Sequence, residues 1–168
     1  ITSNVTITGF LEDASEPNGK LSQATVLTPP VSNLVRTYSP AGDHDFYSVI
    51  VHTGDVIDAA ATAVRSTVPP AASDLEGRND PDLVMFLYDH SGAIVAFSDD
   101  FTGLNPRVVF TVPPPGGNSN SNAPRNYRIE VTEFNGSLLS PNGAPRVNAP
   151  PNYRLDATVT PSALAAHM

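Results

Sequence analysis

Cysteine and tryptophan are absent from this chain, and lysine occurs only once, as Lys20. Without cysteine, the chain can form neither a disulfide framework nor a thiolate metal site. The sequence contains no run of about 18 apolar residues, so it offers no candidate for a membrane-spanning helix. No helical hydrophobic period is sustained either, which argues against a fold built from long helices.

Positive charge is also scarce. The chain carries 17 acidic and 9 basic side chains, for a formal net charge of -8 at pH 7. A surface of this sign repels phosphate backbones, so nucleic acid is not an expected partner. The acidic surplus is typical of cation-binding loops and equally of ordinary soluble proteins, and the charge alone leaves both interpretations open.

The length of 168 residues and the hydrophobic fraction of 40% are sufficient for one domain with a buried core. Alternating apolar residues, the pattern of half-buried strands, are clearest at Asp45–His52, Tyr127–Phe134 and Tyr153–Val159. Weaker strand patterns occupy residues 4–10, 24–27, 34–38, 56–64, 83–88, 93–97 and 107–112. Short strands between turn-rich loops predict an all-β fold, an antiparallel β-sandwich over residues 1–161 with a tail at 162–168.

Two pairs of neighbouring strands are predicted to form hairpins. Thr53-Gly54-Asp55 joins residues 45–52 to residues 56–64, and Asp89-His90-Ser91-Gly92 joins residues 83–88 to residues 93–97. Longer segments rich in proline and glycine are predicted to be loop insertions at the ends of the sandwich, at residues 66–79, 113–125 and 135–152.

The two faces of the strand at residues 45–52 differ in character. Tyr47, Val49 and Val51 lie on one face by the period of two, while Phe46 and Ile50 lie on the other. Phe46 and Ile50 are therefore either covered by a neighbouring loop or part of a small recognition patch.

A first group of oxygen-bearing side chains lies before and at the start of this strand. Glu12, Glu16 and Asn18 lie in a polar loop, and Asp43 and Asp45 begin the strand itself. Calcium takes six to eight oxygen ligands and mixes carboxylates with amide and backbone oxygens. These residues are suitable ligand types, although solvated or turn-capping carboxylates explain the same spacing.

A second acidic group brackets the predicted hairpin at residues 83–97. If the two strands pair in antiparallel fashion, Asp80, Asp82, Asp99 and Asp100 gather at its open end. Carboxylates at such short separation repel one another unless a cation or a donor network neutralises them. The sequence therefore predicts either a second cation site or a set of turn-capping aspartates.

Catalytic signatures are missing from the sequence. It contains no metalloprotease HExxH helix, no GxSxG nucleophile elbow, no P-loop and no dinucleotide-binding fingerprint. A zinc site built on His44 and His52 would need a third ligand that the spacing does not identify. We therefore expect a protein that is not an enzyme.

The order of the short motifs is more informative than any one of them. The series resembles the bacterial pre-peptidase C-terminal domain family, which is related to the collagen-binding domains of bacterial collagenases, and it covers residues 12–159. Its members here are Glu16-Pro17-Asn18, Asp43–Val49, Thr53-Gly54-Asp55, Asp82-Leu83, Leu87-Tyr88-Asp89, Gly92, Ser98-Asp99-Asp100, Tyr127–Val131 and Tyr153-Arg154-Leu155.

The resemblance implies a jelly-roll-like sandwich that is itself non-catalytic and is appended to a secreted enzyme. It also implies calcium in the segment leading into the first long strand, because Glu16, Asn18 and Asp45 match ligand positions of the family. Two departures stand out. Gly19 replaces an acidic ligand of the collagen-binding members, and Thr132 replaces an aromatic residue that those members present to collagen. Collagen binding is therefore not implied for this chain.

The resemblance predicts an extracellular accessory domain of a secreted bacterial protease or other exoenzyme. Its expected partners are the parent enzyme domain and an extracellular protein or polysaccharide polymer, and its expected cofactor is calcium. The chain begins at Ile1 and shows no signal peptide, so we expect a mature or excised fragment. The alternative is a carbohydrate-binding or cell-surface adhesion module, although the lack of tryptophan counts against a sugar-binding platform.

Overall fold

The computed structural model describes residues 14–37, 43–64, 82–116, 122–134 and 152–162. Within these ranges it contains a single 3-10 turn, η1 (Leu21–Gln23), and no α-helix. The nine described strands are β1 (Thr25–Val26), β2 (Val31–Thr37), β3 (His44–Val51), β4 (Val56–Ala63), β5 (Leu83–Tyr88), β6 (Ile94–Ser98), β7 (Arg107–Thr111), β8 (Arg125–Glu133) and β9 (Asn152–Thr160). The strand predicted at residues 4–10 lies outside the described part of the chain.

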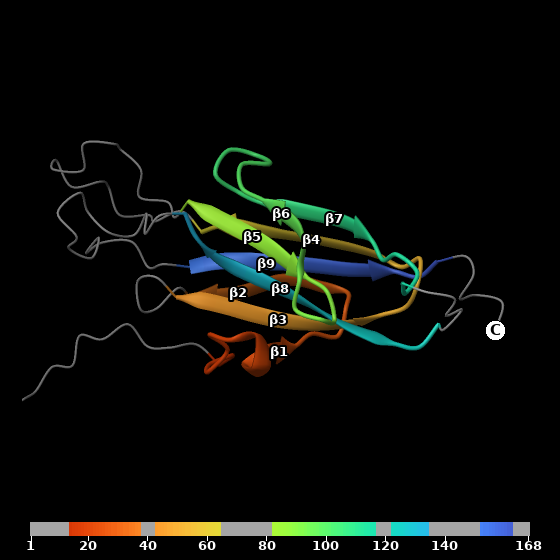
Figure 1. The fold of residues 1–168 in the computed structure, drawn as a ribbon. Helices are drawn as coiled ribbons and strands as arrows, with labels where there is room; N and C mark the ends of the chain where they lie inside the picture. The colour runs from red at the N-terminus through yellow and green to blue at the C-terminus, as the bar shows by residue number, and fades with distance from the viewer. Residues whose placement is uncertain (1–13, 38–42, 65–81, 117–121, 135–151, 163–168) are drawn as a thin grey trace, which may run out of the picture.

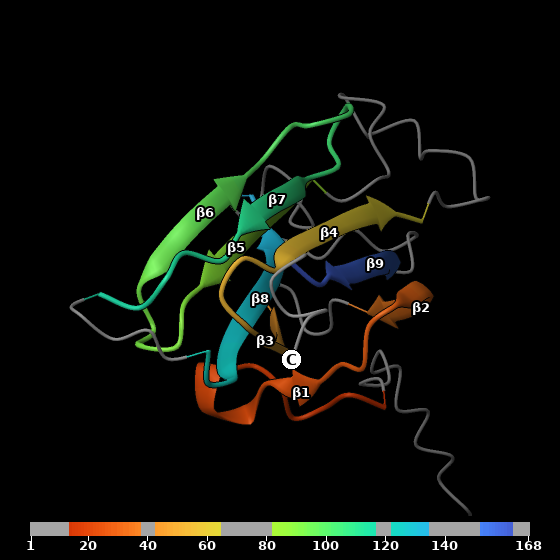
Figure 2. The ribbon, with the colours of Figure 1, turned by 90° about the vertical axis from the view of Figure 1, so that its right-hand side faces the viewer.

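The strands form two sheets that face each other (Figures 1 and 2). The five-stranded sheet has the order β1-β3-β8-β5-β6, and the four-stranded sheet has the order β2-β9-β4-β7. Eight strands remain when the short β1 is left out. Counted along the chain from one to eight, they have the order 2-7-4-5 in the first sheet and 1-8-3-6 in the second. This is the strand order of a jelly roll, so the predicted all-β sandwich and its jelly-roll topology are confirmed.

The core lies between the sheets and is built by strict alternation along the longer strands. Each of β3, β8 and β9 turns every second side chain inward. The inward residues with at most 2% exposure on these strands are Tyr47, Val49, Val51, Tyr127, Ile129, Val131, Tyr153, Leu155 and Ala157. The predicted division of the β3 faces is therefore confirmed, and it leaves Asp45 pointing into the sandwich from the strand start.

The predicted hairpin between residues 45–52 and 56–64 is wrong. β3 pairs with β1 and β8, whereas β4 pairs with β7 and β9 in the other sheet. The turn between them instead carries the chain across the sandwich, with Gly54 at φ 84° and the Asp55 carboxylate accepting a hydrogen bond from the His52 N–H at 2.8 Å. A local turn signal marks the reversal of the chain but does not determine which strand becomes the neighbour.

The predicted hairpin of β5 and β6 is confirmed and lies at one edge of the five-stranded sheet. Its turn is organised by Asp89, whose Oδ1 accepts hydrogen bonds from the Ser91 N–H at 2.8 Å, the Ser91 hydroxyl at 2.6 Å and the Ala93 N–H at 3.0 Å. Gly92 supplies the positive φ of 86° that the turn requires.

No helix of the described residues is long and apolar enough to cross a membrane.

Candidate functional site

The entry segment, residues 14–24, is fixed against the start of β3. The Phe46 N–H donates a hydrogen bond to the Asn18 carbonyl at 3.1 Å, so Asn18 lies directly beside the strand. Further along, β1 adds to β3 in parallel, with Thr25 opposite Tyr47. The segment is also anchored through Ser15, whose hydroxyl accepts from Arg36 Nε at 2.5 Å. These contacts bring the side chains of the entry segment to the N-terminal end of β3.

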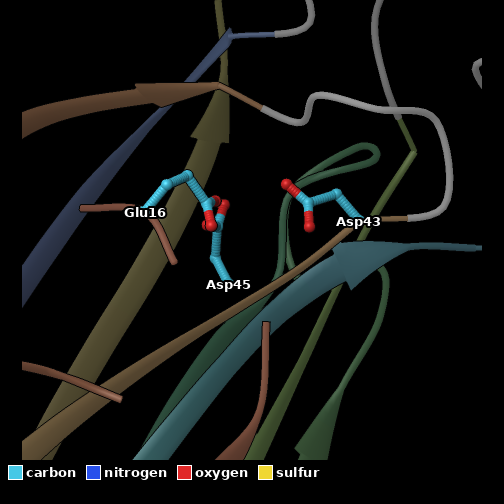
Figure 3. Close-up of side chains that lie close together, drawn as sticks. All are labelled: Glu16, Asp43 and Asp45. Carbon is cyan, nitrogen blue, oxygen red and sulfur yellow. The ribbon is translucent and has the colours of Figure 1, made fainter. Parts of the chain in front are cut away.

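Three carboxylates converge at this junction and form what we call the carboxylate cluster. Glu16, Asp43 and Asp45 each offer an oxygen, and these oxygens lie within 4.8 Å of one another. Figure 3 shows the three carboxylate groups turned toward a common space. Asp45 is fully buried, and Glu16 and Asp43 are half-buried. The structure therefore brings together three of the predicted ligands, while Glu12 lies outside the described residues.

Asn18, the fourth predicted ligand in the described chain, is also beside the cluster. Its N–H donates to Glu16 Oε2 at 3.0 Å, and the residue is 0% exposed. Neither its amide oxygen nor its amide nitrogen makes a hydrogen bond within the described chain. A buried amide without a partner is costly, and an amide oxygen is a ligand that calcium accepts. An oxygen-only donor set of three carboxylates and one amide fits calcium better than zinc.

Asp45 is tied to the core through two tyrosines. The Tyr153 hydroxyl donates to Asp45 Oδ2 at 2.7 Å and lies 2.5 Å from the Tyr47 hydroxyl. Both tyrosines are 0% exposed, and Tyr153 comes from β9 in the opposite sheet. The network therefore joins the carboxylate cluster to both layers of the sandwich. Alternation placed Tyr153 inside, but no local signal pointed to Asp45, which is 108 positions away.

His44 and His52 do not build a zinc site together. His44 lies between Asp43 and Asp45 in the chain, yet it points to the opposite face of β3, where its Nδ1 is 2.5 Å from Glu130 Oε1. The Nδ1 of His52 lies 3.6 Å from Asp55 Oδ2 at the other end of the strand. The two rings thus have separate acidic neighbours.

The second predicted acidic group is also partly assembled. Asp82, Asp99 and Asp100 have carboxylate oxygens within 4.8 Å of one another at the open end of the β5–β6 hairpin, whereas Asp80 lies outside the described residues. Burial, and then the negative charge of Asp100, raise the pKa of Asp99. Repulsion between neighbouring carboxylates is thus one of the two causes of this shift, and cation binding here stays a prediction.

A strip of aromatic rings crosses the outer face of the five-stranded sheet. Phe46, Glu130, Phe86 and Phe97 are paired in one row across β3, β8, β5 and β6, and Tyr88 belongs to the next row. Ring centroids are 5.9 Å apart for Phe46 and Tyr88, 6.4 Å for Tyr88 and Phe86, and 5.1 Å for Phe86 and Phe97. We call Phe46, Tyr88, Phe86 and Phe97 the aromatic strip.

Exposure increases from one end of the aromatic strip to the other. Phe46 is 8% exposed and Phe97 is 56% exposed. Phe46 is covered by Tyr88 of a strand rather than by a loop, whereas Ile50 is 54% exposed, and a recognition role for either residue stays a prediction. Of the aromatic strip, only Phe46 was a candidate from the sequence, because the four rings come from three strands.

A buried carboxylate underlies the aromatic strip. Glu130 is 4% exposed, faces His44 on one side and accepts a hydrogen bond from the Tyr88 hydroxyl on the other. Burial, and then the hydrogen bond to Glu130, raise the pKa of Tyr88 above its ordinary range, which keeps its hydroxyl a donor. His44 thus connects the carboxylate cluster with the aromatic strip. Its chain neighbours Asp43 and Asp45 belong to the cluster, and its ring contacts Glu130 beside the strip.

Comparison with known proteins gives matches in structure but not in sequence. No protein-family model and no curated protein matches the chain. Among solved structures it is similar to the pre-peptidase C-terminal domain of collagenase from Bacillus anthracis, with 13% sequence identity and a TM-score of 0.48, over 80% of this chain and 94% of that one. It is also similar to PliG of Aeromonas hydrophila, a periplasmic inhibitor of g-type lysozyme, with 11% identity and a TM-score of 0.47, over 82% and 96% of the two chains.

One of these two structures is thus a pre-peptidase C-terminal domain, the family that the motif order predicted. At these identities the similarity concerns the fold alone, and it assigns neither a ligand nor an activity to this chain.

Proposed function

We propose that this chain is a non-catalytic, extracellular accessory domain of a secreted protease or other exoenzyme, and that calcium holds its entry segment on the sandwich. The observation that carries the proposal is the convergence of Glu16, Asp43 and Asp45 within 4.8 Å, with the buried Asn18 beside them. The order of motifs adds the accessory role, because the domains that this chain resembles are appended to secreted enzymes.

Calcium would act here as a structural link. Glu16 and Asn18 belong to the entry segment, whereas Asp43 and Asp45 belong to the start of β3, so one cation would join two parts of the chain. The cation would supply positive charge where three carboxylates meet and would be coordinated by the buried Asn18 amide oxygen. An ion that binds only the folded state stabilises it by RT ln(1 + [L]/Kd).

The test is a thermal melt in chelator and in millimolar calcium, with magnesium as the control. At a calcium concentration 100 times Kd, stabilisation is about 2.7 kcal/mol. For a domain of this size, that corresponds to a rise in Tm of about 5–10 °C. Magnesium demands a smaller octahedral site and dehydrates reluctantly, so its effect is expected to be much smaller.

Matched variants locate the ion. Asp43→Asn is expected to remove most of the calcium-dependent rise, whereas Asp58→Asn is expected to keep it, because Asp58 lies on β4 and pairs with Arg107 at 2.6 Å. A wild-type Tm that is the same in chelator and calcium would contradict the calcium site. So would a full calcium response in the Asp43→Asn variant.

The aromatic strip supports attachment to a polymer as the accessory role. The exposed ring of Phe97, packed against Phe86, offers apolar contact on the outer face of the sheet. We expect the full chain to co-sediment with an insoluble protein fibre and Phe97→Ala to weaken this binding. Val109→Ala is the control, because Val109 is 60% exposed but lies on β7 in the other sheet.

Sedimentation with chitin or cellulose in place of a protein fibre would instead favour the carbohydrate-binding module. Absence of binding to every polymer, together with self-association of the chain, would favour the adhesive alternative. Either result would contradict attachment to a protein fibre but would not change the interpretation of the calcium melts.

A further inference from the structure

Asn18 is followed by Gly19, and this dipeptide lies inside the candidate calcium site. An asparagine amide can be attacked by the backbone nitrogen of the next residue, and glycine offers the least obstruction because it has no side chain. Whether this attack occurs depends on how the structure holds the two reacting groups, the Asn18 amide carbon and the Gly19 nitrogen.

The backbone of Asn18 is fixed on both sides, but its side chain is not. Its N–H donates to Glu16 Oε2 at 3.0 Å, and its carbonyl accepts from the Phe46 N–H at 3.1 Å. The amide oxygen and nitrogen of the side chain make no hydrogen bond within the described residues. The side chain that must turn toward the Gly19 nitrogen is thus not held by a hydrogen bond of its own within the described residues.

The Asn18–Gly19 peptide group is also primed as the nucleophile. The hydrogen bond from Phe46 to the Asn18 carbonyl withdraws charge from this peptide group, which stabilises the amidate that forms when Gly19 loses its proton. Gly19 is exposed, so water can take up the proton. Across the described chain, no hydrogen bond from the Gly19 N–H competes with the attack.

We infer that Asn18 is a self-modification site, at which the chain converts a neutral calcium ligand into a carboxylate. The Gly19 nitrogen forms a bond to Asn18 Cγ, the Cγ–Nδ2 bond breaks, and ammonia leaves as a succinimide closes. Water then opens the ring at one of its two carbonyls and gives aspartate or isoaspartate. The net change is the addition of water and the loss of ammonia, with no redox step.

The consequence for the site rests on the proposed calcium function. An aspartate at position 18 adds a fourth negative group beside Glu16, Asp43 and Asp45. In chelator the added charge increases repulsion and lowers stability, while bound calcium reverses the effect. The modification would thereby add a further acidic ligand to the carboxylate cluster and make the domain more dependent on calcium. An isoaspartate would instead lengthen the backbone and disturb the contact with Phe46.

The experiment follows the site by peptide mapping and mass spectrometry. The full chain is incubated at pH 8 in chelator, and the conversion of Asn18 is compared with that of Asn135 and Asn142, which also precede glycine. We expect conversion at Asn18 in the wild type and its loss in Gly19→Ala. An Asn18 that stays intact while Asn135 and Asn142 convert would overturn the inference.

The control variant is expected to fold. Gly19 does not have a positive φ, and an added Cβ would meet the His44 carbonyl oxygen at 3.7 Å and Asp43 Oδ1 at 4.0 Å, which are ordinary contacts. Circular dichroism of Gly19→Ala checks this directly. If Gly19→Ala is folded and still converts at the wild-type rate, attack by the Gly19 nitrogen is refuted.

A second variant separates this inference from the calcium proposal. Asn18→Asp is expected to show a larger rise in Tm between chelator and calcium than the wild type. Conversion of Asn18 with no calcium response in either protein would support the modification and refute the calcium site. A calcium response without conversion would do the reverse.

Discussion

Replacement of Tyr153 by phenylalanine tests whether the carboxylate cluster is anchored in the core. The change removes one hydroxyl, which donates to Asp45 Oδ2 at 2.7 Å and contacts the Tyr47 hydroxyl at 2.5 Å. The ring is 0% exposed and keeps its packing, so the loss reports on the hydroxyl. A matched control is Tyr47→Phe, which removes the hydroxyl that contacts Tyr153.

The two substitutions are expected to lower the free energy of unfolding by different amounts, because the acceptors of the lost hydrogen bonds differ. A hydrogen bond to a charged group contributes about 1.5–3 kcal/mol, whereas one between neutral groups contributes about 0.5–1.5 kcal/mol. Tyr153→Phe is therefore expected to cost about 2–3 kcal/mol, and Tyr47→Phe about 1 kcal/mol. For a domain of this size, 2–3 kcal/mol lowers the Tm by about 4–12 °C.

The assay is urea unfolding followed by circular dichroism, with both variants measured in chelator. Chelator is required because a bound cation would itself neutralise Asp45 and mask the loss of the donor. If Tyr153→Phe costs no more than Tyr47→Phe, the hydroxyl does not stabilise a buried carboxylate. The role assigned to the network across the two sheets would then have to be abandoned.

Two further predictions concern turns. Desolvation raises the pKa of Asp89, but hydrogen bonds, chiefly from Ser91, outweigh it and leave the pKa below its ordinary value. Asp89→Ala should therefore cost about 1 kcal/mol at neutral pH, and the loss should shrink as the pH falls from about 4 through the lowered pKa, as urea midpoints would show. A loss that is unchanged in acid would contradict this. Gly54→Ala should lower the Tm more than Gly103→Ala. Both glycines have a positive φ, so both substitutions strain the backbone. Only at Gly54 would the added Cβ also meet an atom, Ser162 Cβ at 2.8 Å, whereas a Cβ at Gly103 would meet no atom within 4 Å. Equal losses would show that the contact is relieved without cost.

The strands themselves could be predicted from the sequence. Tyr47, Val49 and Val51 alternate with residues of the opposite face, and this period of two is a local property of an extended chain. The division between buried and outer faces therefore followed for β3, β8 and β9. The jelly-roll order did not follow from periodicity, and it was predicted only through the resemblance of the motif series.

The error at Thr53-Gly54-Asp55 shows the limit of local signals. The turn was identified correctly, but the strands on either side belong to different sheets. β3 forms backbone hydrogen bonds with β1, which is nearby in the sequence, and with β8, which is about 80 positions away. Pairing at that separation is decided by which faces can be buried together, and no turn motif encodes it.

By itself, the sequence determined which side chains could bind a cation and which face of each strand is apolar, because residue type and the period of two are local. The meeting of Glu16 with Asp45 was predicted only through the family resemblance, and only the tertiary structure decided that Tyr153 reaches Asp45 and that Glu130 is buried against Tyr88 of the aromatic strip. The physical reason is that these contacts join segments from different strands and sheets. They form only when the collapse of the whole sandwich offsets the loss of chain entropy on closing long loops.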